Sequence, residues 1–206
     1  MKRINLFAMA TIISVALVSC GGSAEPKTET KKVAEDATVE VINLNVNTAE
    51  SSVMWSGSVL GMHSHAGTVS ITEGSLEMTG KAVSGGMFTI DMKSIHPTDS
   101  AYTEEKTPDM LVGHLSSADF FLVDSFPTAS FIIKSADMAN NSITGDLTVR
   151  GTTNEEVIEN VQVNTDSGEA SGNITFDRQK YGVAFSHPMK DVVISDDIVL
   201  KIKLKF

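Results

Sequence analysis

Two histidines separated by one residue are the first side chains in this sequence whose types could do chemistry. His63 and His65 would point to the same face of a strand, because strand side chains alternate. Imidazole nitrogens bind zinc, but a catalytic zinc takes about three protein ligands and keeps an open position. His114 or His187 would have to converge on the pair, and nothing in the sequence requires that. We therefore predict no metal site and keep a histidine-based metal protein as an alternative.

Arg178 is the second candidate for a chemical role. Alternation from Ala170 through Ile174 and Phe176 places Arg178 on the apolar face at the end of a strand. A guanidinium in such a position needs an anion. Two partners stay open at this point, a carboxylate at the rim of the domain or the phosphate of a ligand.

The sequence contains none of the short motifs that mark common enzyme classes. It has no G-x-S-x-G nucleophile, no H-E-x-x-H zinc motif and no glycine-rich phosphate loop. Its one cysteine, Cys20, leaves no thiol for a domain further along the chain. We predict that the protein is not an enzyme.

The first 20 residues have the order of an export signal. Lys2 and Arg3 precede an apolar stretch over 4–18, which is shorter than the ~20 residues that span a bilayer. The ending Leu-Val-Ser-Cys resembles the lipobox of bacterial lipoproteins, in which the cysteine is acylated after cleavage. We expect a signal peptide over 1–19 and a membrane anchor at Cys20, which places the protein in the bacterial cell envelope, facing the periplasm or in the outer membrane.

A segment of small and charged residues follows the cysteine. Residues 21–41 read GGSAEPKTETKKVAEDATVEV, which offers too little apolar surface to offset the entropy of ordering. We expect residues 20–45 to hold the acylated cysteine and a flexible tether, and residues 46–206 to form the folded domain. With 26 acidic and 16 basic residues and a net charge of −10, the chain is not expected to bind nucleic acid.

Hydrophobic alternation with a period of two dominates the sequence from Asn47 onward. At the C-terminus Leu200, Ile202 and Leu204 share one face, and Lys201 and other lysines share the opposite face. Glu73-Gly74 and similar pairs are typical of turns. The expected strands are 51–60, 66–72, 75–80, 84–93, 128–135, 143–149, 156–164, 169–178 and 198–206.

Only the segment 108–118 has helical spacing, with Leu111, His114 and Leu115 on one face. Many short strands with turn signals indicate an antiparallel sandwich or barrel. The predicted fold class is all-β, with about eight strands and one short helix that closes an end. An exposed edge strand could pair with a second copy, so a homodimer stays open.

Several blocks of the sequence resemble the YceI-like family. Residues 115–131, LSSADFFLVDSFPTASF, are similar to its L-x-S-x-D-F-F-x-V-x-x-Y-P-T-A-x-F signature, with Phe126 in place of the tyrosine. The resemblance covers about 46–206, and an insert around 96–108 departs from it. Further matching blocks are Trp55-Ser56-Gly57, GMFTIDMKSI over 86–95, ITGDLTVRGTT over 143–153 and FDRQKYGV over 176–183.

The resemblance implies a lipocalin-like barrel that binds a long apolar lipid of polyisoprenoid or isoprenoid quinone type. The protein would then sequester or carry that lipid at the envelope, and no other cofactor is expected. A family pattern G-x-H-x-G gives His63 and His65 a structural role or contact with the ligand head group, and Arg178 is the third head-group candidate.

The inward-facing apolar residues are the candidate lipid-binding set. A barrel of about eight strands can either fill itself with side chains or hold one ligand. The alternative function is therefore a solid-core scaffold that displays loops such as 94–109 to a protein partner. The candidate residues are Trp55, Phe88, Ile90, Met92, Phe131, Ile133, Leu147, Ile174 and Phe176.

Overall fold

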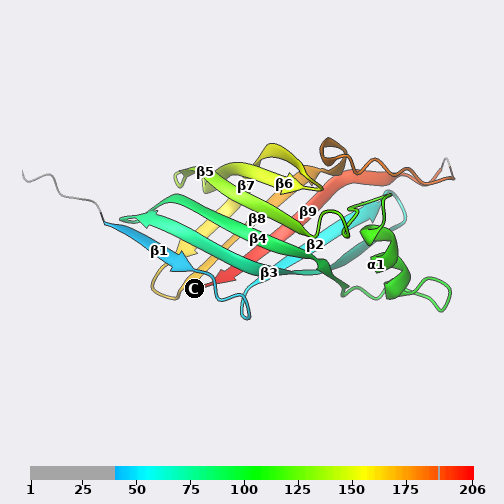
Figure 1. Cartoon of the computed structure of the whole chain (residues 1–206), viewed down its shortest axis with the longest axis horizontal. Helices are drawn as coiled ribbons and strands as arrows, with labels where there is room; N and C mark the ends of the chain where they lie inside the picture. Colours follow the sequence, from blue (N-terminus) through cyan, green and yellow to red (C-terminus); the bar gives the residue numbers. More distant parts are fainter. Residues whose placement is uncertain (1–39, 190) are drawn as a thin grey trace, which may run out of the picture. The chain divides into compact units, whose positions relative to one another are not determined.

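The computed structural model describes residues 40–189 and 191–206, which contain nine strands, one α-helix and one 3-10 helix (Figure 1). The predicted signal peptide, Cys20 and the tether up to residue 39 lie outside the described residues. The elements are β1 Val41–Asn45, β2 Ser52–Val59, β3 His63–Thr79, β4 Ala82–Pro97, α1 Pro108–Ser116, β5 Thr128–Asp137, β6 Ser142–Val149, β7 Thr152–Asn164, β8 Glu169–Asp177, η1 Arg178–Tyr181 and β9 Ile194–Lys205.

Strands β2 to β9 form a closed antiparallel barrel. Each strand pairs with the next one along the chain, and β9 pairs with β2, so the ring has eight members. The predicted fold class, a lipocalin-like barrel of about eight strands with one short helix, is confirmed. Closure provides partners for both edges of these strands.

The long strand β3 corrects the prediction of two strands, 66–72 and 75–80, separated by a turn at Glu73-Gly74. The chain instead passes straight through this pair, and the pairing with β4 shifts register between Ile71 and Glu73. A Cβ at Gly74 would lie 2.7 Å from the ring of Phe88. Thr72 is the extra residue of a bulge, and Gly74, paired with Phe88, leaves room for the close approach of that ring, which is another common use of glycine in strands.

Strand β1 corrects the predicted end of the tether at residue 45. Val41 to Asn45 pair antiparallel with Thr79 to Ser75, beyond the part of β3 that pairs with β2. Leu44 packs against the core. The last residues of the charged segment become ordered because β3 is longer than β2 and offers them a free edge.

Every second residue of a barrel strand directs its side chain into the interior. In β6, Ile143, Gly145, Leu147 and Val149 are buried and the residues between them are half-buried. All nine strands and both hydrophobic clusters of the described residues, 40–189 and 191–206, belong to one compact unit. This unit has its own core, which is the property of a domain that folds by itself.

Helix α1 forms where the sequence predicts it. Pro108 occupies the first turn, and Thr107 caps the helix by accepting a hydrogen bond from the amide of Met110. Figure 1 shows α1 at one end of the barrel. In the described part of the chain no helix combines the length and the apolar character that a bilayer crossing requires.

Candidate functional site

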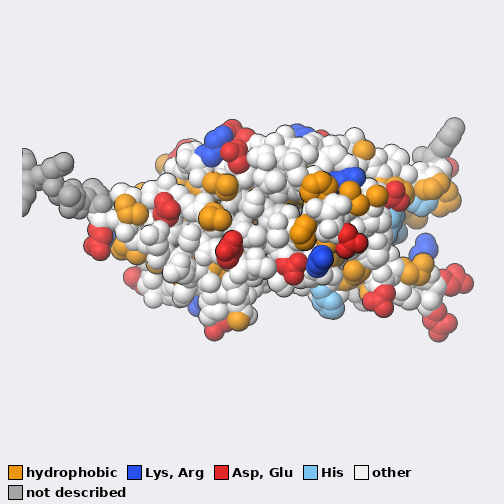
Figure 2. Space-filling view, in the orientation of Figure 1, with side chains coloured by type: hydrophobic (Ala, Val, Ile, Leu, Met, Phe, Trp, Pro, Cys, Tyr) orange, Lys and Arg blue, Asp and Glu red, His pale blue; other side chains and the backbone are white. Residues whose placement is uncertain are grey.

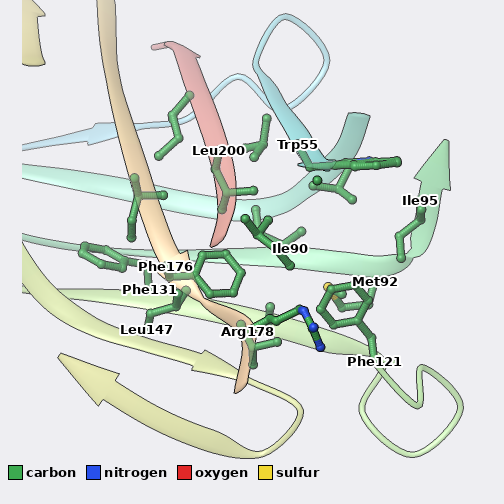
Figure 3. A pocket seen from close by; sticks show the side chains of 18 of the residues that line it. Trp55, Ile90, Met92, Ile95, Phe121, Phe131, Leu147, Phe176, Arg178 and Leu200 are labelled. Carbon is green, nitrogen blue, oxygen red and sulfur yellow. The ribbon is translucent and has the colours of Figure 1, made fainter. Parts of the chain in front are cut away.

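The barrel interior contains a cavity of about 360 Å³ whose wall is almost entirely apolar. The inward faces of the barrel strands form this wall, and α1 and the loops beside it contribute at one end. Figure 3 shows Trp55, Ile90, Phe131 and Phe176 directed toward this space. Cavities of roughly 300–1,000 Å³ are typical of small-molecule sites.

All nine predicted interior residues line the cavity. Their alternation along the strands was sufficient to identify the inward face. Their contact with a lipid stays a prediction. The set is Trp55, Phe88, Ile90, Met92, Phe131, Ile133, Leu147, Ile174 and Phe176.

A close backbone approach positions Trp55, the only tryptophan of the chain. Its indole Nε1 donates a hydrogen bond to the carbonyl of Thr68 across 3.2 Å. A Cβ at Gly67 would lie 2.5 Å from the indole ring and would also meet the carbonyl oxygen of His96. Only glycine at position 67 lets the indole lie against β3.

The predicted set of interior residues did not include a group of apolar residues in and beside α1. The rings of Phe120 and Phe185 both contact His114, with centroid distances of 4.9 and 4.7 Å. Helical spacing indicates the inward face of α1, but loop residues have no such period. The missed lining residues at this end are Ile95, Leu111, Leu115, Phe120, Phe121 and Phe185.

The histidines that line the cavity gather where β3 begins and where α1 and the loop after η1 lie. His63, His65, His114 and His187 all line this part of the cavity, which is called the α1 end below. His63 is exposed as well, so the cavity reaches the surface there. Figure 2 shows histidine side chains at the end that carries α1. An amphiphile would find its polar contacts at this end.

The two predicted histidines do lie side by side, with ring centroids 5.0 Å apart. Within residues 40–189 and 191–206, no three histidine, cysteine or acidic side chains are grouped so that they could hold a metal ion. His114 is turned toward Asp119, at 3.6 Å, and toward two phenylalanine rings. The arrangement gives the alternative of a metal protein no support.

The loop between β4 and α1 places an anion beside His65. Both carboxylate oxygens of Asp99 lie 3.4 Å from Nδ1 of His65. The carboxylate also accepts hydrogen bonds from the amides of Ala66 and Ala101 and from the hydroxyl of Tyr102. Burial by itself raises the pKa of Asp99, but these hydrogen bonds outweigh it and lower the pKa to about 2. Asp99 is therefore ionised at neutral pH.

Tyr102 completes this arrangement. Its ring stacks on His65 with a centroid distance of 5.3 Å and an interplanar angle of 19°. Burial and the hydrogen bond to Asp99 raise the pKa of Tyr102 to about 12, so the phenol stays a donor. Asp99 and Tyr102 come from the insert at 96–108, where no periodic pattern points to the histidines.

Arg178 is the first residue of η1, not the last residue of a strand, and it is 3% exposed. Its guanidinium donates to the carbonyls of Val183, Ser195 and Ile194. It also forms an ion pair with Asp196 at 3.0 Å. Of the two partners that the sequence leaves open, the structure shows the rim carboxylate. Arg178 lines the cavity, and four of its five N–H groups have partners within the protein. This gives it a structural role, and its contact with a ligand head group stays a prediction.

A second arginine holds the wall of the α1 end together. Arg150, in the turn after β6, donates to the carbonyls of Phe120 and Gly182, both at 2.7 Å, and of Ala118 at 3.0 Å. These bonds tie the loop after α1 to the loop after η1. The sequence places Arg150 on the outward face of a strand, where this positioning role is not visible.

Parts of the chain are similar to known proteins. The sequence profile of the YceI-like domain matches residues 44–206. A UPF0312 protein of Staphylococcus aureus (strain bovine RF122 / ET3-1) is 30% identical over 149 residues, which cover 67% of this chain and 85% of the relative. The UPF0312 protein of strain USA300 is 33% identical over 104 residues, or 45% of this chain and 59% of that relative. The chain thus matches less than two thirds of the length of the second relative.

Solved structures also superpose on the barrel. Burkholderia cenocepacia BcnA has a TM-score of 0.55 at 19% identity, over 77% of this chain and 98% of BcnA. A polyisoprenoid binding domain from Saccharophagus degradans has a TM-score of 0.49 at 10% identity, over 80% and 97% of the two chains. The similarity to BcnA shows that the two proteins share a fold.

Proposed function

Since the chain belongs to the YceI-like family, we propose that it binds a long apolar lipid, of polyisoprenoid or isoprenoid quinone type, inside its barrel. The observation that carries this proposal is the apolar cavity that reaches the surface at the α1 end. Each CH₂ group that leaves water for such a space contributes ~0.8 kcal/mol. A solid-core scaffold would have no such cavity.

The distribution of lining residues gives the ligand a direction. Leu76, Val161 and Leu204 line the cavity away from the histidines and are buried. The hydrocarbon tail therefore lies among these residues, and the polar head lies at the α1 end. This arrangement suits a lipid with one polar end, which is sequestered or carried without covalent change, so the proposed role is binding and not catalysis.

We propose that the protein works at the bacterial cell envelope, anchored through acylated Cys20. The support is the order of the first 20 residues, two basic residues followed by an apolar stretch and Leu-Val-Ser-Cys. Two or three acyl chains give durable anchoring. A lipid that is sparingly soluble in water would then move only a short distance between the bilayer and the barrel.

The test is native mass spectrometry combined with lipid extraction. The domain over residues 40–206, exported by a bacterium and purified without detergent, should carry one long-chain lipid per protein. A ligand-free domain that also rejects added isoprenoid lipids would overturn the proposal.

Neighbouring isoleucines of β5 provide a matched pair of variants. Ile133 is buried and lines the cavity, whereas Ile132 faces outward and is 51% exposed. Ile133→Trp should fill the cavity and lower the bound lipid at least tenfold, while Ile132→Trp should keep it. Circular dichroism checks that both variants fold. Equal lipid content in the two variants would place the lipid outside the barrel.

A further inference from the structure

We propose that the α1 end of the cavity is a subsite for a neutral head group that bears a hydroxyl, and that Nε2 of His65 accepts its hydrogen bond. An isoprenoid alcohol or a hydroquinone has this chemistry. The inference rests on the proposed function, because it concerns the polar end of the same ligand.

The Asp99 carboxylate fixes the proton of His65. Asp99 is ionised and so can only accept hydrogen bonds, and its two oxygens both face Nδ1 of His65. Nδ1 must therefore carry the proton. In the neutral imidazole the second nitrogen, Nε2, then has a lone pair and acts as an acceptor. A hydroxyl is the complementary donor.

The ring of His65 is held in place without a ligand. Tyr102 stacks on its face and His63 meets it edge to face. Asp99, which sets the proton position, is itself fixed by two backbone amides. An acceptor that is already oriented loses little entropy when a ligand binds. These contacts involve the insert at 96–108, so the subsite is assembled from β3 and this loop.

The charges at this end argue against a phosphate head group. Arg178 is the only Lys or Arg among the described residues that line the cavity; Asp196 pairs with its charge, and Asp196 and three carbonyls accept four of its five N–H groups. Asp99 adds a negative charge next to His65. A phosphate would be buried here beside an anion and without a free cation, which is costly.

The experiment measures the affinity of three probes with one C20 tail. These are geranylgeraniol, its monophosphate and the hydrocarbon with hydrogen in place of the hydroxyl. Quenching of Trp55, the only tryptophan and a lining residue, reports binding to the lipid-free domain of residues 40–206 at pH 8, where free imidazole is neutral. The alcohol should bind about tenfold more tightly than the hydrocarbon, which corresponds to one hydrogen bond, and more tightly than the phosphate.

Variants identify the acceptor. His65→Phe keeps an aromatic ring for Tyr102 and should abolish the preference for the alcohol over the hydrocarbon, while circular dichroism checks that the variant folds. His65→Leu is the second variant if the phenylalanine fails to fold. His96→Phe is the matched control, because His96 is exposed and does not line the cavity.

The outcomes separate this inference from the proposed function. Equal affinity for alcohol and hydrocarbon, or tightest binding of the phosphate, overturns the head-group inference and leaves lipid binding in place. A preference for the alcohol that survives in both His65 variants also overturns it. Binding of none of the three probes overturns both.

Discussion

The hydroxyl of Tyr181 donates a hydrogen bond to Oε1 of Glu156 across 3.1 Å, and both side chains are buried. The ring of Tyr181 also meets Phe176, a cavity-lining residue, edge to face. Lys180 approaches the same carboxylate oxygen at 3.7 Å. The pair satisfies an acidic side chain that points into the barrel wall, where an unpaired carboxylate would be unfavourable.

Tyr181→Phe should lower the free energy of unfolding by about 1–3 kcal/mol, because it leaves a buried acceptor without its donor. Urea denaturation of the domain over residues 40–206 measures this change. The double variant Tyr181→Phe with Glu156→Gln is the control, and a double-mutant cycle isolates the pair. A loss below about 0.5 kcal/mol in Tyr181→Phe would contradict the role given to the hydrogen bond.

The stability of the domain should fall in acid partly through Asp99. The pKa of Asp99, about 2, lies below the ordinary value of an aspartate, so its contribution is present above about pH 4 and is lost as the pH falls toward 2. The contribution is about 2 kcal/mol. Asp99→Asn should flatten this part of the stability curve, measured by urea denaturation between pH 5 and pH 2. Asp124→Asn, at an exposed position, should retain the slope, and an equal slope in Asp99→Asn would refute the assignment.

The ion pair of Arg178 and Asp196 should respond unequally to the loss of each partner. Arg178→Met removes donors from three carbonyls and a carboxylate around a buried position, which should cost about 3–5 kcal/mol. The side chain of Asp196 is 49% exposed, so Asp196→Asn should cost no more than about 1 kcal/mol. Thermal unfolding without lipid tests both. If Arg178→Met changes only lipid binding, the structural role of Arg178 is wrong.

Two glycines should respond in opposite directions to alanine. Gly67→Ala places a methyl group against the Trp55 ring and a backbone carbonyl, so it should destabilise the domain by about 1–3 kcal/mol and shift the tryptophan emission. Gly113 lies within α1, and a Cβ there meets nothing within 4 Å. Gly113→Ala should therefore stabilise the domain by up to about 1 kcal/mol. Equal effects of the two substitutions on the melting temperature would contradict the packing described here.

The alternation of apolar and polar residues with a period of two was enough to predict most strands of the barrel. Phe131, Leu147 and the other inward candidates could be assigned to the interior because one face of each strand is apolar. The turn predicted at Gly74 was wrong, because glycine also occurs inside strands where a side chain of the partner strand approaches closely, here Phe88. Closure of the ring depends on the pairing of β9 with β2. Local sequence patterns do not predict which strands pair at such a distance along the chain.

The α1 end was much less predictable than the wall. His63 and His65 stand out by type and spacing, but Asp99 contacts His65 from a loop more than 30 residues away in sequence. Phe185 and Arg150 likewise act through contacts between loops. Arg178 was selected as a cation on an apolar face, and the sequence does not show its partners, which include the carbonyls of the first two residues of β9.

Strand β1 also determines how the domain would respond to mechanical force. It is joined to β3 through five residue pairs, starting at Val41 opposite Thr79, and the ring of β2 to β9 closes without it. Tension on the N-terminal side of Val41 would open these pairs one after another, as in unzipping, before it reached the ring. In a single-molecule pulling experiment this would appear as a short extension step at low force, followed by a second step at a much higher force. The detachment of β1 would thus come before any unfolding of the barrel.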